Sequence, residues 1–353
     1  MKILKTFSEL IQGRQNNLDF LRFVAATLVI YSHAYPLTGN DLLEPINQIT
    51  NGQTTLGAIA VYCFFVISGF LITQSFLYSR SIGSFIKARV LRIFPGLILV
   101  TLFTVLIVGP LITSESLIKY FSNSQTYFYF TKITTFVPDL PLPGVFDSNI
   151  YQNAVNGSLW TLKYEIICYA MIGFLGGFGL LKKQVIITLF LINTFISIIP
   201  VNLGKTLTDL NILSLYFLSG SVFYFYRDKI KHSYIYLLLS LLVTILIISL
   251  GWLKPFFPLL CSYFIFYFAY SAKIRLYNFS KFGDFTYGIY IFAFPIQQII
   301  VHVFNNNISP IENFLLSLPF VFLCSIVSWY LVERPALLLK NKNIKRIVSQ
   351  KVS

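Results

Sequence analysis

Apolar stretches of membrane-spanning length recur along the whole chain, and they constrain its fold more than any other feature. A helix needs about 20 mainly apolar residues to cross the hydrocarbon core of a bilayer. Charged residues make up only 11% of the chain, and the mean hydropathy is +0.72, so a soluble globular protein is excluded. Such stretches lie at residues 17–37, 56–79, 94–114, 159–178, 183–200, 210–226, 233–250, 255–271, 285–304 and 312–333. The sequence therefore predicts an all-α, polytopic transmembrane bundle of about ten spans.

The distribution of basic residues predicts the orientation of this bundle. The formal net charge is +14, and most Lys and Arg residues fall on one side of the predicted membrane. Cytosolic segments are richer in Lys and Arg than external ones, so that side is expected to be cytosolic and to hold both termini. The charge then reflects topology, and no nucleic-acid partner is indicated. The basic residues expected elsewhere are Lys119, Lys132, Lys205 and Lys254 outside, with Arg22 and Lys163 in spans.

The chain is expected to form one membrane domain over residues 1–353. We predict a cytosolic N-terminus at 1–16, a helical bundle at 17–333 and a basic cytosolic tail at 334–353. The 115–158 segment is predicted to be an external, structured cap, and residues 85–96 a cytosolic loop. The first apolar run lacks a small-x-small cleavage site, so we interpret it as a retained span. The four cysteines form no CxxC pair and are expected to be buried thiols, with no metal site.

The first span carries three ionisable side chains, Asp19, Arg22 and His33. Arg22 and His33 are eleven residues apart, which is about three helical turns plus roughly 20°, so they share a face. Ionisable groups at membrane depth normally face a protein interior or a water-filled cavity. Two simpler interpretations stay open: Arg22 pairs with Asp19 near the membrane surface, and a helix carbonyl satisfies a neutral His33.

A second polar cluster is predicted at the cytosolic side. On a helix, Arg89 and Arg92 would share a face and grip two oxygens of one anion, such as a phosphorylated donor. Ordinary anchoring at the membrane boundary is the alternative. In the second span, Ser68 and Gly69 are expected to let a neighbouring helix approach closely rather than to supply a nucleophile, because a G-x-S-x-G turn is absent.

Two later segments also place polar groups in spans. Glu165 is expected about two turns into its span, at the depth of His33, where a carboxylate raises the basicity of an imidazole. A contact of Glu165 with Lys163 at the headgroup level is the alternative. Tyr287 and Tyr290 share a face, and the amide of Gln297 needs a partner at a cavity wall or a helix contact.

Six motifs together resemble the acyltransferase 3 family of bacterial membrane O-acyltransferases. They are the Arg-x10-His pattern of Arg22 and His33, FFVISGFLI at 64–72, RVLRIFPG at 89–96, NGSLWTLKYE at 156–165, YGIY at 287–290 and WYLVERP at 329–335. The resemblance implies a multi-pass enzyme of the bacterial cytoplasmic membrane. It would move an acyl group, most simply acetyl, from cytosolic acyl-CoA to a hydroxyl of a cell-surface glycan.

The resemblance also implies roles for individual residues. His33 would be catalytic, with Arg22 its companion and Glu165 the acid of its motif. Arg89 and Arg92, with Arg22, would hold the CoA end of acetyl-CoA, and no metal is expected. The candidates for substrate binding are Asn156, Trp160, Tyr164, Tyr287 and Tyr290.

One departure from the family pattern concerns the segment after the paired tyrosines. Many members carry a histidine there, where this chain has Phe292, Ala293 and Phe294. The expected partners remain acyl-CoA, a glycan or lipid-linked sugar, and membrane lipid. A proton-coupled transporter or glycan exporter is the competing hypothesis, although the two halves show no matching pair of Gly- or Pro-broken helices.

Overall fold

The computed structural model describes residues 4–11, 15–79, 81–131, 135–136, 140–152, 154–200, 202–271 and 273–339. In these ranges the regular structure is helical, and one isolated antiparallel bridge joins Thr6 and Lys231. Lys132 and most of the predicted basic tail, residues 340–353, lie outside the described residues.

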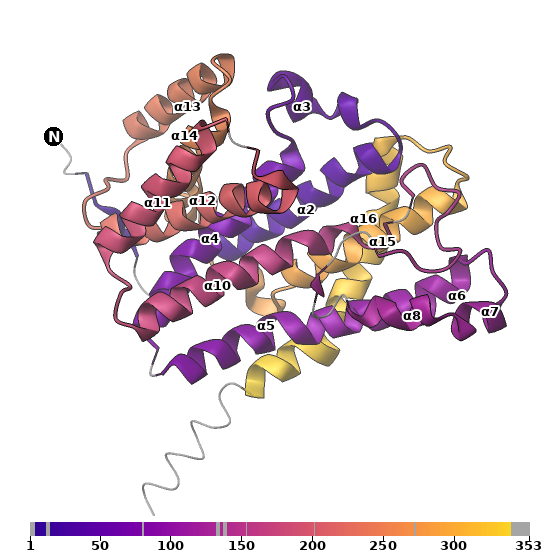
Figure 1. Ribbon diagram of the computed structural model, residues 1–353. Helices are drawn as coiled ribbons and strands as arrows, with labels where there is room; N and C mark the ends of the chain where they lie inside the picture. The colour runs from indigo at the N-terminus through magenta and orange to yellow at the C-terminus, as the bar shows by residue number, and fades with distance from the viewer. Residues whose placement is uncertain are drawn as a thin grey trace, which may run out of the picture. The chain divides into compact units, whose positions relative to one another are not determined.

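Every predicted span coincides with a helix (Figure 1). The helices are α2 (Leu18–Leu37), α4 (Leu56–Leu77), α5 (Ile82–Phe103), α10 (Leu162–Gly177), α11 (Lys183–Ile198), α12 (Gly204–Tyr226), α13 (Tyr234–Ser249), α14 (Leu253–Ala269), α15 (Thr286–Val303) and α16 (Pro310–Ser328). Among the described residues, five helical stretches are long and apolar enough to cross a membrane: Leu18–Leu37, Leu56–Leu77, Ile82–Ile112, Thr286–Val303 and Pro310–Leu339. Their length and composition indicate a multi-pass membrane protein. The count of ten spans and the orientation of the termini stay predictions.

The predicted loop at 85–96 is wrong, because α5 begins at Ile82 and includes both arginines. Beyond Phe103 the helix continues through a π-helical turn, Thr104–Val108, into α6 (Gly109–Ile112). Ala, Leu, Lys and Arg are good helix formers, and no proline precedes Pro95 in this helix. Basic residues mark a membrane boundary but do not end a helix.

The chain forms two compact units, each built from three segments. The first unit comprises Met1–Ala25, Pro45–Ile82 and Tyr164–Phe282, and the second comprises Ala26–Glu44, Gly83–Lys163 and Gly283–Ser353. The division falls inside α2, so Arg22 belongs to the first unit and His33 to the second.

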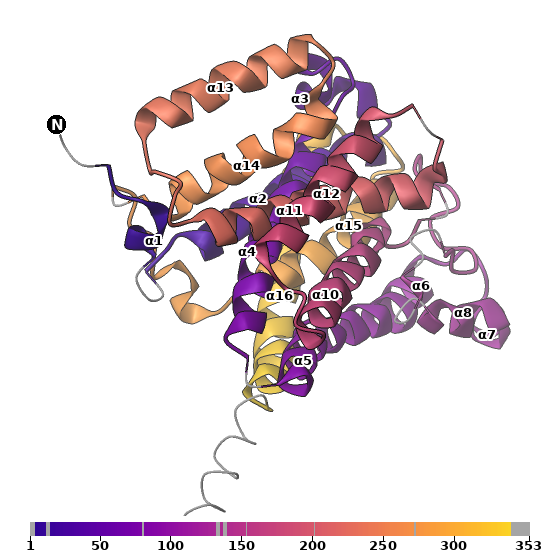
Figure 2. The same cartoon turned by 60° about the vertical axis from the view of Figure 1, so that its left-hand side comes forward.

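The first unit is organised around a close crossing of α4 and α12. A Cβ atom added to Gly69 of α4 would lie 1.8 Å from the carbonyl oxygen of Phe217, and one added to Gly220 of α12 would lie 2.0 Å from that of Val66. The hydroxyl of Ser221 donates to the Gly69 carbonyl at 3.1 Å. The predicted close approach at Gly69 is therefore confirmed. In the same unit α13 and α14 run side by side (Figure 2).

The second unit contains α15 packed on α16 and a folded segment that follows α6. This segment includes α7 (Leu117–Ser122) and α8 (Ser124–Phe128), near the end of the α5–α6 helix (Figure 1). The Tyr120 hydroxyl, buried, donates to the Val105 carbonyl at 2.9 Å. A buried hydrophobic core joins this segment to the preceding helix. It consists of Val105, Val108, Tyr120, Tyr129, Leu142, Val145, Phe146 and Val155. The described residues of the 115–158 segment are thus a packed part of the unit, and the external position of the segment stays a prediction.

The α4–α12 crossing predicts a strong effect of a single methyl group. We expect Gly69→Ala to lower the stability of the solubilised protein by about 1–3 kcal/mol, because backbone atoms of α12 must move to admit the methyl group. Gly83→Ala is the matched control, since Gly83 is helical and nothing lies within 4 Å of an added Cβ. The measurement is the fraction of protein that stays monodisperse after heating, followed as a function of temperature. If half of each variant were lost at the same temperature, the tight crossing would be contradicted.

Candidate active site

His33 lies one turn before the end of α2, in the second unit. Its Nδ1 atom is buried and has no hydrogen-bond partner among the described residues. The imidazole meets the ring of Phe294 edge to face, with 5.6 Å between the ring centroids and 80° between the planes. An imidazole whose nitrogen is not tied to the protein can accept a proton or attack a carbonyl carbon.

The Gln297 amide holds α15 against α2 near this imidazole. Gln297 is fully buried, and its Nε2 donates to the Ile30 carbonyl at 2.9 Å and to Asn313 Oδ1 at 2.9 Å. Ile30 precedes His33 by about one helical turn, and Gln297 follows Phe294 by about one turn. The contact of His33 with Phe294 is therefore flanked by a buried amide network, as the need of Gln297 for a partner predicted.

The NGSLW motif docks onto α15 at a carbonyl that a proline leaves free. Pro295 has no N–H, so the Ile291 carbonyl lacks its usual partner four residues later in the helix. The Asn156 side chain donates its Nδ2–H to that carbonyl at 2.9 Å. Asn156 is fully buried, which makes this bond an anchor of the motif rather than a surface contact.

Tyr290 provides the second anchor of the motif. Its hydroxyl donates to the Ser158 carbonyl at 2.7 Å, and it lies 2.6 Å from Thr161 Oγ1, which must then be the donor of that bond. These residues fix a short 3₁₀ helix, Gly157–Thr161, before α10. A Cβ added to Gly157 would lie 2.6 Å from the ring of Phe294. Asn156 and Tyr290, two predicted substrate-binding residues, thus join the motif to α15, and Trp160 lies half-buried on this turn.

Arg92, one of the two arginines of α5, lies at the start of α15. Arg92 forms a salt bridge with Asp284 at 2.7 Å, and its guanidinium lies 6.0 Å from the centre of the Tyr287 ring. The Tyr287 hydroxyl donates to the Ile93 carbonyl at 2.9 Å. Arg89 is half-buried, with its guanidinium carbon 5.8 Å from the centre of the Phe85 ring. The RVLRIFPG and YGIY motifs therefore pack against each other.

Glu165 lies in the first unit, in the first turn of α10, which directly follows the 3₁₀ helix Gly157–Thr161, and its depth in a membrane stays a prediction. It accepts hydrogen bonds from Ser68 of α4, at 3.4 Å, and from Tyr169, one turn further along α10. Tyr164, also predicted to bind substrate, is buried and donates to Asp209 at 3.4 Å. The pairing of Glu165 with His33 stays a prediction.

Arg22 and Asp19 form an ion pair at 3.9 Å, also in the first unit, as the simpler interpretation of this turn expected. Ser280 donates to the other carboxylate oxygen of Asp19 at 2.5 Å. The guanidinium is about one-fifth exposed, so it is neither buried alone nor freely solvated. The first turn of α2 therefore carries a neutralised pair rather than an isolated charge.

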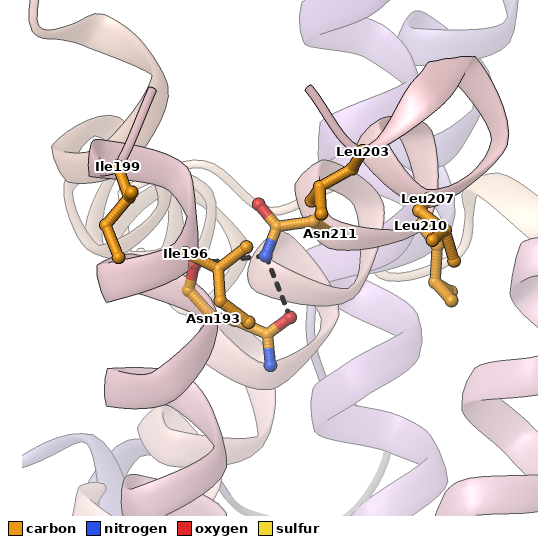
Figure 3. Close-up of a pocket in the computed structure, with 7 residues that line it drawn as sticks. All are labelled: Asn193, Ile196, Ile199, Leu203, Leu207, Leu210 and Asn211. Carbon is orange, nitrogen blue, oxygen red and sulfur yellow. Dashed lines mark hydrogen bonds between the residues drawn. The ribbon is translucent and has the colours of Figure 1, made fainter. Parts of the chain in front are cut away.

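An apolar cavity of about 320 Å³ lies between α11 and α12 of the first unit (Figure 3). At one side, Asn211 Nδ2 donates to Asn193 O at 3.0 Å and to its Oδ1 at 3.1 Å (Figure 3). The lining holds no acid or base: Asn193, Ile196, Ile199, Leu203, Leu207, Leu210 and Asn211. Among the described residues, no group of three His, Cys, Asp or Glu side chains is placed to hold a metal.

Sequence reasoning missed several partners of the predicted site residues. The contact of Tyr169 with Glu165 could have been predicted from the sequence, since Tyr169 follows Glu165 by four residues on a helix. No local sequence signal predicts the contact of Asp284 with Arg92 or that of Ser68 with Glu165, because the partners come from segments distant in sequence. Phe294 was noted only as part of the segment that departs from the family pattern, and its contact with His33 follows from tertiary packing.

Two known proteins resemble this chain, one over most of its length and one over less than half of it. The O-acetyl transferase of Shigella phage Sf6 is 29% identical over 343 residues, which is 91% of this chain and 96% of that protein. Nodulation protein 10 of Rhizobium leguminosarum bv. viciae is 36% identical over 166 residues, 44% of this chain and 43% of that protein. No solved structure matches the chain. The acyltransferase 3 family, described as an acyltransferase domain, matches residues 15–334, so the protein belongs to this family and is an acyltransferase.

Proposed function

We propose that the protein transfers an acyl group, most simply acetyl, from cytosolic acetyl-CoA to a hydroxyl of a glycan or lipid-linked sugar at the bacterial cytoplasmic membrane. The observation that carries the proposal is the His33 imidazole, whose buried Nδ1 has no partner among the described residues and which lies on a helix of membrane-spanning length. The name of the phage relative, an O-acetyl transferase, supports the choice of acetyl and of an oxygen acceptor.

Two routes give the same overall transfer. In direct transfer, His33 takes the proton of the sugar hydroxyl, the oxygen attacks the thioester carbonyl, and the C–O bond forms as the C–S bond breaks. The imidazolium then returns the proton to the CoA thiolate. In two-step transfer, a His33 nitrogen first displaces CoA, and the thiolate takes the imidazole proton. The sugar oxygen then displaces the imidazole, which takes the hydroxyl proton. Both routes bring the acyl group against the His33 ring.

The nucleotide end of acyl-CoA would bind near the N-terminal half of α5. A guanidinium matches the oxygens of a phosphate, which supports Arg89 and Arg92 as ligands. Arg92 already meets Asp284 at 2.7 Å, so that pair carries no net charge. Arg89 lies one turn earlier on the same helix and is half-buried, so we propose it as a ligand of the phosphates, and we assign Arg92 to fixing α5 to α15. We keep Arg22, Glu165, Trp160 and Tyr164 as proposed contributors to the reaction or to acceptor binding.

The catalytic role of His33 is tested with sealed membrane vesicles supplied with acetyl-CoA that is labelled in the acetyl group. We expect His33→Ala to lower label in the glycan or lipid-linked sugar by about 10²–10⁴-fold, the usual worth of a general base. His302→Ala is the matched control, because His302 also lies in the second unit with a buried, unpartnered Nδ1. It should retain activity. Equal labelling by His33→Ala and wild type would refute the role, and sugar flux without labelling would favour the transporter.

The phosphate-binding role of Arg89 is tested by varying the donor. We expect Arg89→Ala to raise the KM for acetyl-CoA about tenfold or more, because a charge-assisted hydrogen bond contributes about 1.5–3 kcal/mol. With acetyl-pantetheine, which lacks the nucleotide, wild type and variant should have the same KM. Lys87→Ala removes a charge from the same helix, where Lys87 Nζ donates to the Leu339 carbonyl, and should leave both KM values unchanged. An Arg89→Ala defect that persists with acetyl-pantetheine would argue against phosphate binding.

A further inference from the structure

We propose that the Phe294 side chain limits the size of the acyl group that can be transferred at His33, and so restricts the donor to short acyl chains such as acetyl. This inference rests on the proposed acyl transfer at His33. It assigns a role in donor specificity to Phe294, which lies in the segment where this chain departs from the family pattern.

The first observation is the position of the ring. The Phe294 ring packs against one side of the His33 imidazole, with the two ring centroids 5.6 Å apart in an edge-to-face arrangement. Only 5% of Phe294 is exposed. In both routes of transfer the acyl chain must lie against the imidazole. On this flank, each additional methylene of the chain would have to displace the phenyl ring.

The second observation is that the ring is confined on its other sides. Gly157 lies so close that even a methyl group there would come within 2.6 Å of the phenyl carbons. The Tyr151 ring packs edge to face on Phe294, with centroids 5.9 Å apart. Protein interiors are close-packed, so a ring held in this way does not move aside without displacing its neighbours.

The third observation is that the backbone carrying this ring is anchored on both sides of it. The Asn156 amide binds the Ile291 carbonyl one turn before Phe294, and the Gln297 amide binds the Ile30 carbonyl one turn after. These bonds involve buried groups, and breaking them would leave polar atoms without partners. The wall beside His33 is therefore rigid in both its side chain and its main chain.

The test compares donors of different length in the same vesicle preparation, so the result does not depend on the amount of folded enzyme. Initial rates of transfer are measured with acetyl-CoA and butanoyl-CoA. We expect Phe294→Ala to raise the ratio of butanoyl to acetyl transfer by about tenfold or more, since a methylene in a shaped pocket changes selectivity by roughly 10–200-fold. Phe292→Ala is the matched control, because Phe292 is equally buried on α15 but packs on Phe103. Its ratio should equal that of wild type.

A second pair of variants tests the contact that confines the ring. Gly157→Ala should reduce acetyl transfer because its methyl group pushes the phenyl ring toward His33. The double variant Gly157→Ala with Phe294→Ala should transfer more acetyl than Gly157→Ala alone, because the obstructing ring is gone. Such recovery requires the two residues to act through each other.

The outcomes separate this inference from the proposed function. Acetyl transfer by wild type with an unchanged donor ratio in Phe294→Ala would overturn the size limit and leave the function standing. An equal shift in Phe292→Ala would also overturn it, since the effect would then come from looser packing of α15. If wild type transfers neither acyl group, both proposals fail.

Discussion

The carbonyl of Ile291, left without its helical partner by Pro295, is the interaction on which the surroundings of His33 depend. A backbone carbonyl away from water must find a donor, because leaving it unpaired costs several kcal/mol in an apolar medium. Asn156 supplies that donor from a segment far away in sequence. Its docking brings Gly157 onto Phe294, and Phe294 borders His33. One missing N–H thus explains why a polar turn docks on α15 beside the imidazole.

The need to pair buried polar groups also shapes the first unit, where close helix packing accompanies it. Hydrophobic burial does not draw helices together in lipid, so close contact and polar pairing must hold them. Gly69 and Gly220 let α4 and α12 approach until backbone atoms touch. The Glu165 carboxylate finds donors in Ser68 and Tyr169, so a costly charge is stabilised within its own unit.

The sequence predicted what depends on local pattern. Apolar runs located all the helices of the bundle, small residues predicted the close approach at Gly69, and spacing offered the Asp19–Arg22 pair as one of the open interpretations. The start of α5 was missed because basic residues signal a membrane boundary while favouring helix as well. The partners of Asn156, Arg92 and Glu165 were missed because they come from distant segments. Periodicity specifies which face of a helix is polar, but not which residue of another helix meets it.

The phenyl ring beside His33 determines what this side of the imidazole can contribute. A phenyl ring has no exchangeable proton and no basic atom, so Phe294 contributes shape rather than an acid or a base. Four buried polar atoms, unpartnered among the described residues, belong to His33, to the NGSLW motif and to α15: His33 Nδ1, Asn156 Oδ1, Ser158 Oγ and Gln297 Oε1. Unpaired buried polar atoms destabilise a fold and are uncommon in native proteins. These four fit the proposed site, in which an acyl donor or a hydroxyl acceptor would complete their polar contacts.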